Sequence, residues 1–349
     1  MISLYQHRHG GADHPVGVSG FSDFSVNISP ILPPGVLEGL DRLPLDRYPS
    51  IDGAGVRDFY VGRFGLDPEM VLSLNGAVEG LYLLPRALAV RRAALFSPSF
   101  HEYERAVLAA GAEVKQIRLQ PGRGFALPPF EELVRDMEDV DALMAGNPGN
   151  PTGTVLPPDV VLALACRFPE KWFIVDEAFI QFTPEFPVNS LMQHLQALKN
   201  VVVVHSLTKF YALPALRFGA LVAHPATISH LLQFKEPWSV NLIAETVARR
   251  LLSCREYEDE LLAMVVAERQ RIAHELAGSP TLALEGGAAN FFLARWRGGC
   301  SVDLLLSRLA AAGVPVRDCR NFRGLEDGYF RFAVRTPPEN DRLLAMLSA

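Results

Sequence analysis

The sequence predicts an α/β protein, in which a large domain with a mostly parallel sheet flanked by helices is followed by a smaller α+β domain. Three observations support this prediction. Short apolar runs alternate with longer amphipathic segments over the first two thirds of the chain, and after Pro237 the pattern changes to long helical stretches. In addition, 349 residues exceed the roughly 250–300 at which a single hydrophobic core stops growing.

The apolar runs are the predicted strands of the large sheet. They are rich in Val, Ile, Leu and Ala, and amphipathic segments separate them. Strands that helices cover on both faces have nearly continuous apolar sequences, so these runs indicate a parallel sheet with helical crossovers. The runs are VLSL (71–74), AALFS (93–97), EVKQIRL (113–119), ALMAG (142–146), WFIVD (172–176), NVVVVHS (200–206) and GALVA (219–223).

The two ends of the chain differ from this pattern. The first residues are rich in Gly, Pro, Ser and His, which predicts an arm or loop rather than a core element. Beyond Pro237, helical stretches at 240–277 and 301–312 accompany short strands at 290–296 and 329–335, which indicates a small α+β domain. The predicted division is an arm at 1–35, a large domain at 36–236 and a small domain at 237–349.

Composition argues against several kinds of partner. A net charge of -6 does not suit the phosphate backbone of DNA or RNA, which requires a basic surface. No run approaches the ~18 uninterrupted apolar residues of a membrane span, and no apolar stretch typical of an export signal is expected at the N-terminus. The four cysteines lie far apart without a Cys-x-x-Cys pair. Neither a metal site nor a disulfide framework is therefore expected, and a reducing cytoplasm fits best.

The clearest candidate for chemistry is Lys209. The chain has only five lysines among 33 Lys and Arg residues, and this one lies in the largely apolar stretch SLTKFYALPALRFG, directly after a predicted strand. A lysine in such surroundings can form a Schiff base with a carbonyl group, while Ser206, Thr208 and Arg217 can contact a phosphate. Taken alone, Lys209 is explained equally well as a surface lysine whose stem covers apolar residues.

Two further features occur at predicted strand ends. NPGNPTG (147–153) has two Asn-Pro steps that hold the chain in a fixed loop, from which Asn150 can hydrogen-bond the oxygen of a planar ligand. Asp176 ends the run WFIVD, where a carboxylate can keep a pyridine nitrogen protonated. Alone, the first is explained as a plain loop and the second as a helix N-cap. Together with Lys209, in this order, they indicate a pyridoxal 5′-phosphate site.

A family resemblance supports this interpretation. The stretches that carry it are HGG (9–11), DFSVNISP (23–30), RYPS (47–50), SPSFHEYERA (97–106), VDEAFIQF (175–182), SLTKFYALPALRFG (206–219) and EPWSVN (236–241). These stretches resemble the fold type I pyridoxal-phosphate enzymes of the aspartate aminotransferase superfamily over almost the whole chain. The order of five candidate residues is also that of the family: Asn150, Asp176, Ser206, Lys209 and Arg217. Within it the chain is most similar to the threonine-phosphate decarboxylases of cobalamin biosynthesis, relatives of the histidinol-phosphate aminotransferases. The resemblance implies a homodimer with an arm that joins the active site.

The resemblance implies a role for each candidate at the cofactor. Lys209 is similar to the lysine that binds the cofactor covalently and later returns a proton to the substrate, and Asp176 to the partner of the pyridinium nitrogen. Phe100 falls where the family stacks an aromatic ring on the cofactor, with a plain core phenylalanine as the alternative. The other implied contacts are Asn150 to the ring oxygen; Gly76, Ala77, Val78, Ser206, Thr208 and Arg217 to the phosphate; and Tyr48 to the phosphate of the neighbouring subunit.

The chain departs from the family pattern at two places. Ala77 and Val78 replace residues that usually offer a hydroxyl or a carboxylate, so only backbone N–H contacts to the phosphate are expected there. Phe179 stands where many aminotransferases of the superfamily have a tyrosine, and the decarboxylase branch also looks like DEAF at this point. The lost hydroxyl alone does not decide which reaction follows.

The implied substrate is a small phosphorylated amino acid. Arg331 resembles the carboxylate-binding arginine of the superfamily, and the decarboxylase resemblance assigns Arg317 to the substrate as well. Arg335 is either a helper or a surface charge, and the surface is favoured. The other implied substrate contacts are His9, Gly10 and Asn27 in the arm, and Asn150.

The implied reaction is decarboxylation of O-phospho-L-threonine to (R)-1-aminopropan-2-yl phosphate and CO₂, which supplies the aminopropanol linker of adenosylcobalamin. Two alternatives stay open: a histidinol-phosphate-type aminotransferase, and a non-catalytic domain that binds the cofactor. The choice between the two reactions depends on which bond of the substrate Cα stands perpendicular to the cofactor ring. Spacing in the sequence does not determine that angle.

Overall fold

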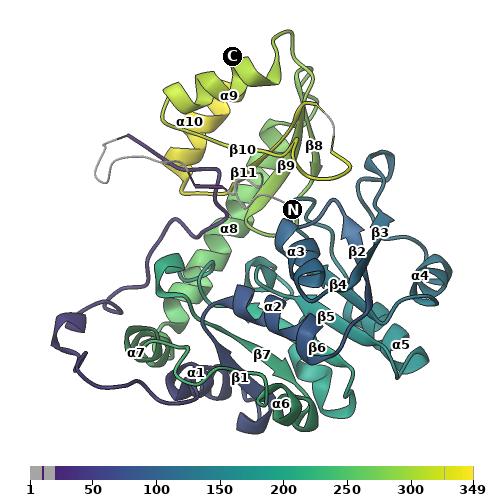
Figure 1. The fold of residues 1–349 in the computed structure, drawn as a ribbon. Coiled ribbons are helices and arrows are strands. Elements are labelled where there is room, and N and C mark those ends of the chain that lie inside the picture. The colour runs from purple at the N-terminus through teal and green to yellow at the C-terminus, as the bar shows by residue number, and fades with distance from the viewer. Residues whose placement is uncertain (1–9, 12–19, 326, 349) are drawn as a thin grey trace.

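The computed structural model describes residues 10–11, 20–325 and 327–348, and these contain two β-sheets (Figure 1). The larger sheet has the strand order β1-β7-β6-β5-β4-β2-β3, and the smaller has the order β10-β11-β9-β8. The larger sheet comprises β1 (Val71–Leu74), β2 (Arg92–Ser97), β3 (Glu113–Arg118), β4 (Ala142–Gly146), β5 (Trp172–Asp176), β6 (Val201–Ser206) and β7 (Gly219–Ala223). The smaller comprises β8 (Leu282–Gly286), β9 (Phe291–Trp296), β10 (Arg317–Asp318) and β11 (Tyr329–Ala333).

The larger sheet is mostly parallel, as predicted. Strands β3, β2, β4, β5 and β6 run parallel to one another, whereas β7 is antiparallel to both of its neighbours, β6 and β1. All seven strands lie where the apolar runs predict them, and their ends differ from the prediction by at most one residue. Because the carboxyl ends of the parallel strands meet at one edge, the polar residues that follow β4, β5 and β6 converge there.

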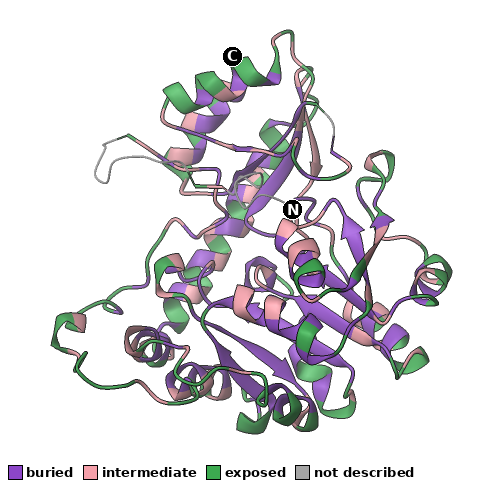
Figure 2. Cartoon of the chain, viewed as in Figure 1, coloured by how far each residue is buried: buried purple, intermediate pink, exposed green. Residues whose placement is uncertain are grey.

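Helices bury both faces of this sheet. Val202 and Val204 of β6 pack into one core together with residues of α2, whereas Val201 and Val203 pack into the other core with residues of α1 and α7. Strands β6 and β7 are consequently buried along their whole length (Figure 2). The helices are α1 (Ala54–Phe64), α2 (Ala77–Ala87), α3 (His101–Ala109), α4 (Phe130–Met137), α5 (Pro158–Arg167), α6 (Pro225–Leu231), α7 (Leu242–Leu251), α8 (Arg255–Glu275), α9 (Val302–Ala311) and α10 (Pro337–Ser348).

The chain beyond Pro237 forms the smaller sheet and its helices, and also α7, which packs against α1 on the larger sheet. Helices α7, α8 and α9 and strands β9 and β11 lie within the stretches that the sequence predicts, whereas β8, β10 and α10 were not predicted. None of the described helices is long and apolar enough to cross a membrane. The division at residues 35/36 and 236/237 stays a prediction.

The described part of the N-terminal arm packs on the smaller sheet. Residues 20–35 contain no helix or strand, as predicted, but the expectation that they contribute no core element is wrong. Phe24 is fully buried and belongs to the main core cluster. Its N–H donates to the carbonyl oxygen of Pro315 at 2.9 Å, and its own carbonyl accepts from the N–H of Ala333 at 2.9 Å. These bonds hold the arm against β11.

Candidate active site

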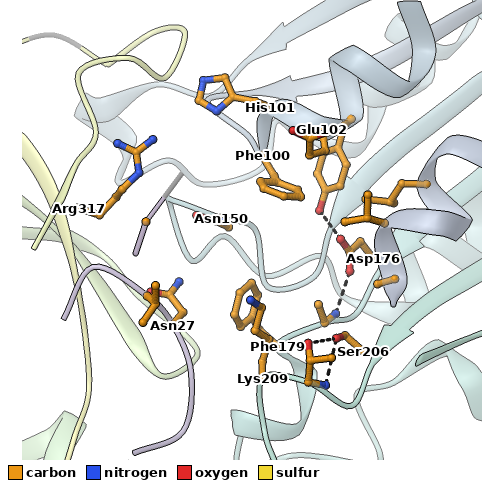
Figure 3. Close-up of a pocket in the computed structure, with 18 of the residues that line it drawn as sticks. Asn27, Phe100, His101, Glu102, Asn150, Asp176, Phe179, Ser206, Lys209 and Arg317 are labelled. Atoms are coloured by element: carbon orange, nitrogen blue, oxygen red, sulfur yellow. Dashed lines mark hydrogen bonds between the residues drawn. The ribbon is translucent and has the colours of Figure 1, made fainter. Parts of the chain in front are cut away.

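A pocket of about 470 Å³ lies between the carboxyl ends of the parallel strands and the smaller sheet. Arg317 and Asn27 stand on one side of it and Asp176 and Ser206 on the other, with Lys209 between them (Figure 3). The predicted site residues that line the pocket are Gly10, Asn27, Ala77, Val78, Phe100, Asn150, Asp176, Ser206, Thr208, Lys209, Arg217, Arg317 and Arg331. The structure thus brings together residues that are far apart in the sequence.

Lys209 lies three residues beyond the end of β6, and its surroundings favour the neutral amine. Burial, which has the largest effect, and the positive charges of Arg331 and Arg217 together lower the pKa of Lys209 to about 8, while Asp176 acts in the opposite direction. A lowered pKa makes a lysine a nucleophile near neutral pH. Lys209 is therefore placed to attack a carbonyl group rather than to serve as a surface charge.

Asp176, the last residue of β5, is a buried carboxylate at the base of the pocket. Burial raises its pKa to about 6, against the hydrogen bonds that it accepts from the N–H of Ala178 at 3.0 Å and the Tyr103 hydroxyl at 2.9 Å. No α-helix begins at this residue, so the N-cap alternative does not describe it. A buried carboxylate of this kind is suited to a cationic partner, such as a protonated pyridine nitrogen.

The pocket wall at β6 and α2 can hold a phosphate. The hydroxyls of Ser206 and Thr208 are 2.7 Å apart, and Arg217 adopts a left-handed backbone conformation with φ of 56°. Gly76, with φ of 78°, precedes α2, and a Cβ at this position would collide with the guanidinium of Arg217. A glycine is therefore required where the arginine approaches the helix N-terminus, and this cluster of donors fits an anion.

Two arginines of the smaller sheet face the same pocket. Arg317 of β10 and Arg331 of β11 are direct partners in the antiparallel register, and both are buried. Arg331 donates from Nη2 to the carbonyl oxygen of Ser25 at 2.9 Å and from Nη1 to the side-chain oxygen of Asn150. Burial lowers the pKa of Arg331 to about 10. Two neighbouring buried cations with a common cavity are suited to an anionic ligand.

The arm adds an unsatisfied amide to this side of the pocket. Asn27 is buried, and neither its side-chain nitrogen nor its oxygen has a hydrogen-bond partner among the described residues. A buried amide without a partner carries a free-energy penalty of about 1–3 kcal/mol. Because Asn27 also lines the pocket, a ligand that hydrogen-bonds to it would remove that penalty.

Comparison with known proteins places this geometry in a family. The sequence model of aminotransferase class I and II matches residues 44–347. The chain belongs to this family. The family fits the site, since the pocket offers a nucleophilic lysine, a buried carboxylate and an anion cradle to one planar, phosphorylated cofactor.

Individual relatives of this aminotransferase-family chain point to two activities. The chain is 32% identical over 360 residues to the threonine-phosphate decarboxylase of Salmonella typhimurium, covering 99% of this chain and 97% of that protein. The solved histidinol-phosphate aminotransferase of Clostridium acetobutylicum aligns with a TM-score of 0.84 and 27% identity, covering 93% and 97% of the two chains. The L-threonine-O-3-phosphate decarboxylase of Porphyromonas gingivalis aligns with a TM-score of 0.74 and 25% identity at the same coverages.

These similarities confirm three predictions. The fold is that of the fold type I enzymes, pyridoxal 5′-phosphate is the cofactor, and the resemblance to threonine-phosphate decarboxylases holds over nearly the full length. The role of each individual site residue stays a prediction. The observations above give it physical support.

Three predicted residues of this family member are described but do not line the pocket: Gly76, Tyr48 and Arg335. Arg335 is not a surface charge, because its side chain is only 17% exposed and donates to Glu339 at 2.9 Å and to the carbonyl of Asp23 at 3.2 Å. It does not line the pocket either, since β11 ends at Ala333 and the chain turns away. Tyr48 is 82% exposed and also lies outside the pocket, while His9 lies outside the described residues.

The sequence reasoning missed several residues of the site. Tyr103 was part of a quoted stretch, but its bond to Asp176 was not foreseen. Its position three residues after Phe100, one helical turn further on the same face, is the signal that indicates a shared pocket. The other pocket residues without a predicted role are Ser25, Val26, Leu81, His101, Glu102, Ala178 and Phe322.

The lowered pKa of Lys209 leads to a measurable pH dependence. In the apoprotein, the rate at which an amine-specific reagent modifies Lys209 is expected to reach half its maximum near pH 8, since only the neutral amine reacts. Peptide mass spectrometry of timed samples gives the rate, with the exposed Lys199 as the internal reference for reagent concentration. Removing a positive neighbour by Arg331→Gln should move the midpoint to higher pH. A midpoint that stays in place would mean that Arg331 does not act on this lysine.

Proposed function

We propose that the chain uses bound pyridoxal 5′-phosphate to decarboxylate O-phospho-L-threonine, giving (R)-1-aminopropan-2-yl phosphate and CO₂ for the aminopropanol linker of adenosylcobalamin. The observation that supports this most is the pair of buried arginines, Arg317 and Arg331, which line one pocket with Lys209 and Asp176. Each guanidinium is suited to bind one anionic group. O-Phospho-L-threonine has two such groups, a carboxylate and a phosphate, and the similarity to threonine-phosphate decarboxylases supports it further.

The residues of the pocket have distinct tasks in this reaction. Pyridoxal 5′-phosphate, when bound, supplies an electron-accepting ring that stabilises the negative charge left on Cα as CO₂ departs. Arg331 binds one end of the substrate and Arg317 the other, which fixes the Cα–carboxylate bond relative to the cofactor. Lys209, which is partly protonated near pH 8, would return a proton to Cα from its ammonium Nζ and become neutral. Phe100 and Phe179 line the pocket and help to exclude water.

A histidinol-phosphate aminotransferase is the second candidate, because the fold of that enzyme from Clostridium acetobutylicum is closely similar. Histidinol phosphate is an amino alcohol phosphate without a carboxylate, so it would leave one of the two arginines without an anionic partner. Incubation of the purified protein with O-phospho-L-threonine, and separately with histidinol phosphate plus 2-oxoglutarate, decides between them. We expect CO₂ in the first reaction and no glutamate in the second, and the reverse result would exclude the decarboxylase.

Arg331→Lys tests the proposed substrate. Lysine keeps the charge but loses the planar guanidinium, and it cannot reach Ser25, Asn150 and a substrate carboxylate together. We expect kcat/KM for O-phospho-L-threonine to fall roughly 10- to 150-fold. This corresponds to a loss of about 1.5–3 kcal/mol of transition-state stabilisation, the scale of a charge-assisted hydrogen bond. Arg295→Lys, on neighbouring β9 and outside the pocket, is the matched control. Equal kinetics in the two variants would place the substrate anion elsewhere.

The active unit that we propose is a homodimer. Tyr48 is 82% exposed and Trp238 47%, their rings lie 5.2 Å apart, and the N–H of Trp238 donates to the carbonyl of Ile51 at 2.9 Å. Exposed apolar residues that gather in this way are typical of an interface. The predicted contact of Tyr48 with the cofactor phosphate of a second subunit requires such a dimer.

Sedimentation equilibrium tests this dimer. At micromolar concentration we expect twice the chain mass of 38.4 kDa, and we expect Trp238→Asp to shift the mass toward the monomer and to weaken cofactor binding, because it places a charge in an apolar contact. Leu304→Asp, at an exposed leucine of α9, is the control and should leave the dimer intact. A parent protein that sediments as a monomer would exclude the role of Tyr48.

The compartment that we propose is the cytoplasm. All four cysteines are free, which suits a reducing environment. Fractionation of the source cells with an antibody to the protein would test this, and recovery in a secreted or membrane fraction would contradict it.

A further inference from the structure

Besides the carbonyl of Asp318, to which Nη1 donates, two neighbours that have no role so far contact the guanidinium of Arg317. Its Nη2 donates to the side-chain oxygen of Asn321 at 3.0 Å, and its Cζ lies 5.2 Å from the centre of the Phe322 ring. Phe322 is buried and lines the active-site pocket. A guanidinium that packs on an aromatic ring and donates to a nearby acceptor has lost much of its rotational freedom before a ligand arrives.

His101 contacts both Phe322 and Asn321 from the opposite side of the pocket, where the larger sheet lies. His101, the first residue of α3, places its ring centre 4.5 Å from that of Phe322, and its Nε2–H donates to the carbonyl oxygen of Asn321 at 3.0 Å. Next in the chain, the carbonyl of Arg323 accepts a hydrogen bond from the hydroxyl of Ser97, at the end of β2, at 2.9 Å. The segment after β10 is thus tied to β2 and α3 across the pocket.

Charge repulsion explains why Arg317 needs this support. Arg331 lies directly opposite in the strand register, and both arginines are buried, so water screens their mutual repulsion poorly, although the charge of Asp318 attracts Arg317. In the absence of a ligand, repulsion favours rotation of the Arg317 side chain away from Arg331. The ring of Phe322 and the acceptor on Asn321 oppose that rotation.

We propose that Phe322 and Asn321 are positioning residues that hold the Arg317 guanidinium ready for an anionic group of the substrate, and that His101 fixes them from across the pocket. The inference rests on the proposed function only in requiring that Arg317 binds an anionic substrate group. Since these residues act through Arg317, they affect substrate binding and leave cofactor binding unchanged.

Phe322→Leu is the first test, because leucine keeps an apolar side chain but removes the aromatic face. We expect KM for O-phospho-L-threonine to rise about 3- to 30-fold, the range of a cation–π contact in a buried site, with kcat within about threefold and an unchanged dissociation constant for the cofactor. Phe332→Leu, at a buried phenylalanine of β11 that packs on Phe292, is the matched control. It should lower the melting temperature without raising KM.

A double-mutant cycle separates positioning from general damage. In an Arg317→Gln background, Phe322→Leu should change KM by less than about twofold, because the contact that it removes is already lost. Titration of the absorbance of the bound cofactor with O-phospho-L-threonine in the Lys209→Ala protein gives the same comparison as an equilibrium constant without turnover. An equal effect of Phe322→Leu in both backgrounds would overturn the proposal.

The double-mutant cycle can be measured with either candidate substrate, so its outcome does not depend on which of the two reactions the protein catalyses. If the parent protein converts histidinol phosphate and not O-phospho-L-threonine, the decarboxylase function is wrong, but the cycle can be measured with histidinol phosphate. A non-additive effect there supports the positioning role, and an additive one overturns it.

Discussion

Lys209→Ala is expected to abolish turnover of O-phospho-L-threonine while some cofactor stays bound. Loss of a general acid–base group alone lowers a rate by about 10²–10⁴, and the variant also loses the covalent attachment of the cofactor. Asp176 and the donors near Arg217 remain, so binding weakens without disappearing. Release of CO₂ measures the first effect, and equilibrium dialysis of the cofactor measures the second.

Stability separates this loss of chemistry from unfolding. Burial and two arginines disfavour the charged form of Lys209, so its removal relieves an unfavourable charge, and the melting temperature of the apoprotein is not expected to fall. Lys199→Ala, at an exposed lysine, is the control and should behave as the parent. Turnover of the Lys209→Ala variant within tenfold of the parent would contradict the assignment of this lysine.

The larger sheet was predictable because its strands are covered on both faces. The run NVVVVHS is apolar along its length since Val201 and Val203 enter one core and Val202 and Val204 the other, and such a run is visible without knowledge of its neighbours. Strand β8 was missed because four of its five residues are only partly buried and it ends in Gly286. Its pairing with β9 decides its structure, and that contact is not local.

The site was predictable where chain position alone places a residue. Asp176 and Lys209 follow parallel strands, whose carboxyl ends meet at one edge of the sheet. Tyr103 reaches Asp176 only because α3 packs on β2 and β3, and Phe24 is buried only because the arm pairs with β11. Neither contact can be predicted from the local sequence. Arg335 was wrongly placed on the surface for the same reason, because the partners that bury it are Glu339 of α10, a helix that was not predicted, and the carbonyl of Asp23 in the distant arm.

Asp176→Asn is expected to raise the stability of the apoprotein and to lower the activity of the loaded enzyme. Burial raises the pKa of Asp176 from 3.8 to about 6, so folding favours its protonated form. This carboxyl therefore lowers the free energy of unfolding of the apoprotein as pH rises from about 4 to about 6. Above pH 6 the ionised, buried carboxylate lowers that free energy by about 3 kcal/mol in total. Asparagine carries no charge to desolvate. The apoprotein of the variant should therefore melt higher than the parent at pH 7 and lose less stability between pH 4 and 6, where the neighbouring Glu177, whose pKa burial raises to about 7, still contributes.

The same substitution should impair the loaded enzyme. Asparagine cannot keep a pyridine nitrogen protonated, and we expect kcat to fall by about 10²–10³, the scale on which a preorganised electrostatic contact acts, together with weaker cofactor binding. Differential scanning calorimetry of the apoprotein and steady-state release of CO₂ provide the two measurements. A variant with parental kcat and lower stability would identify Asp176 as a structural residue only.

Tyr103→Phe provides an intermediate step between the parent and this variant. It removes one donor to the carboxylate and keeps the negative charge, so the pKa of Asp176 should rise further and cofactor binding should weaken less than in Asp176→Asn. Tyr82→Phe is the matched control, because its hydroxyl donates to Glu102 at 2.6 Å and not to Asp176. If Asp176 acts through its charge, the dissociation constant for the cofactor should increase in the order parent, Tyr103→Phe, Asp176→Asn, with Tyr82→Phe equal to the parent. The reverse order would mean that the tyrosine hydroxyl contacts the cofactor directly and that the charge of Asp176 is not required.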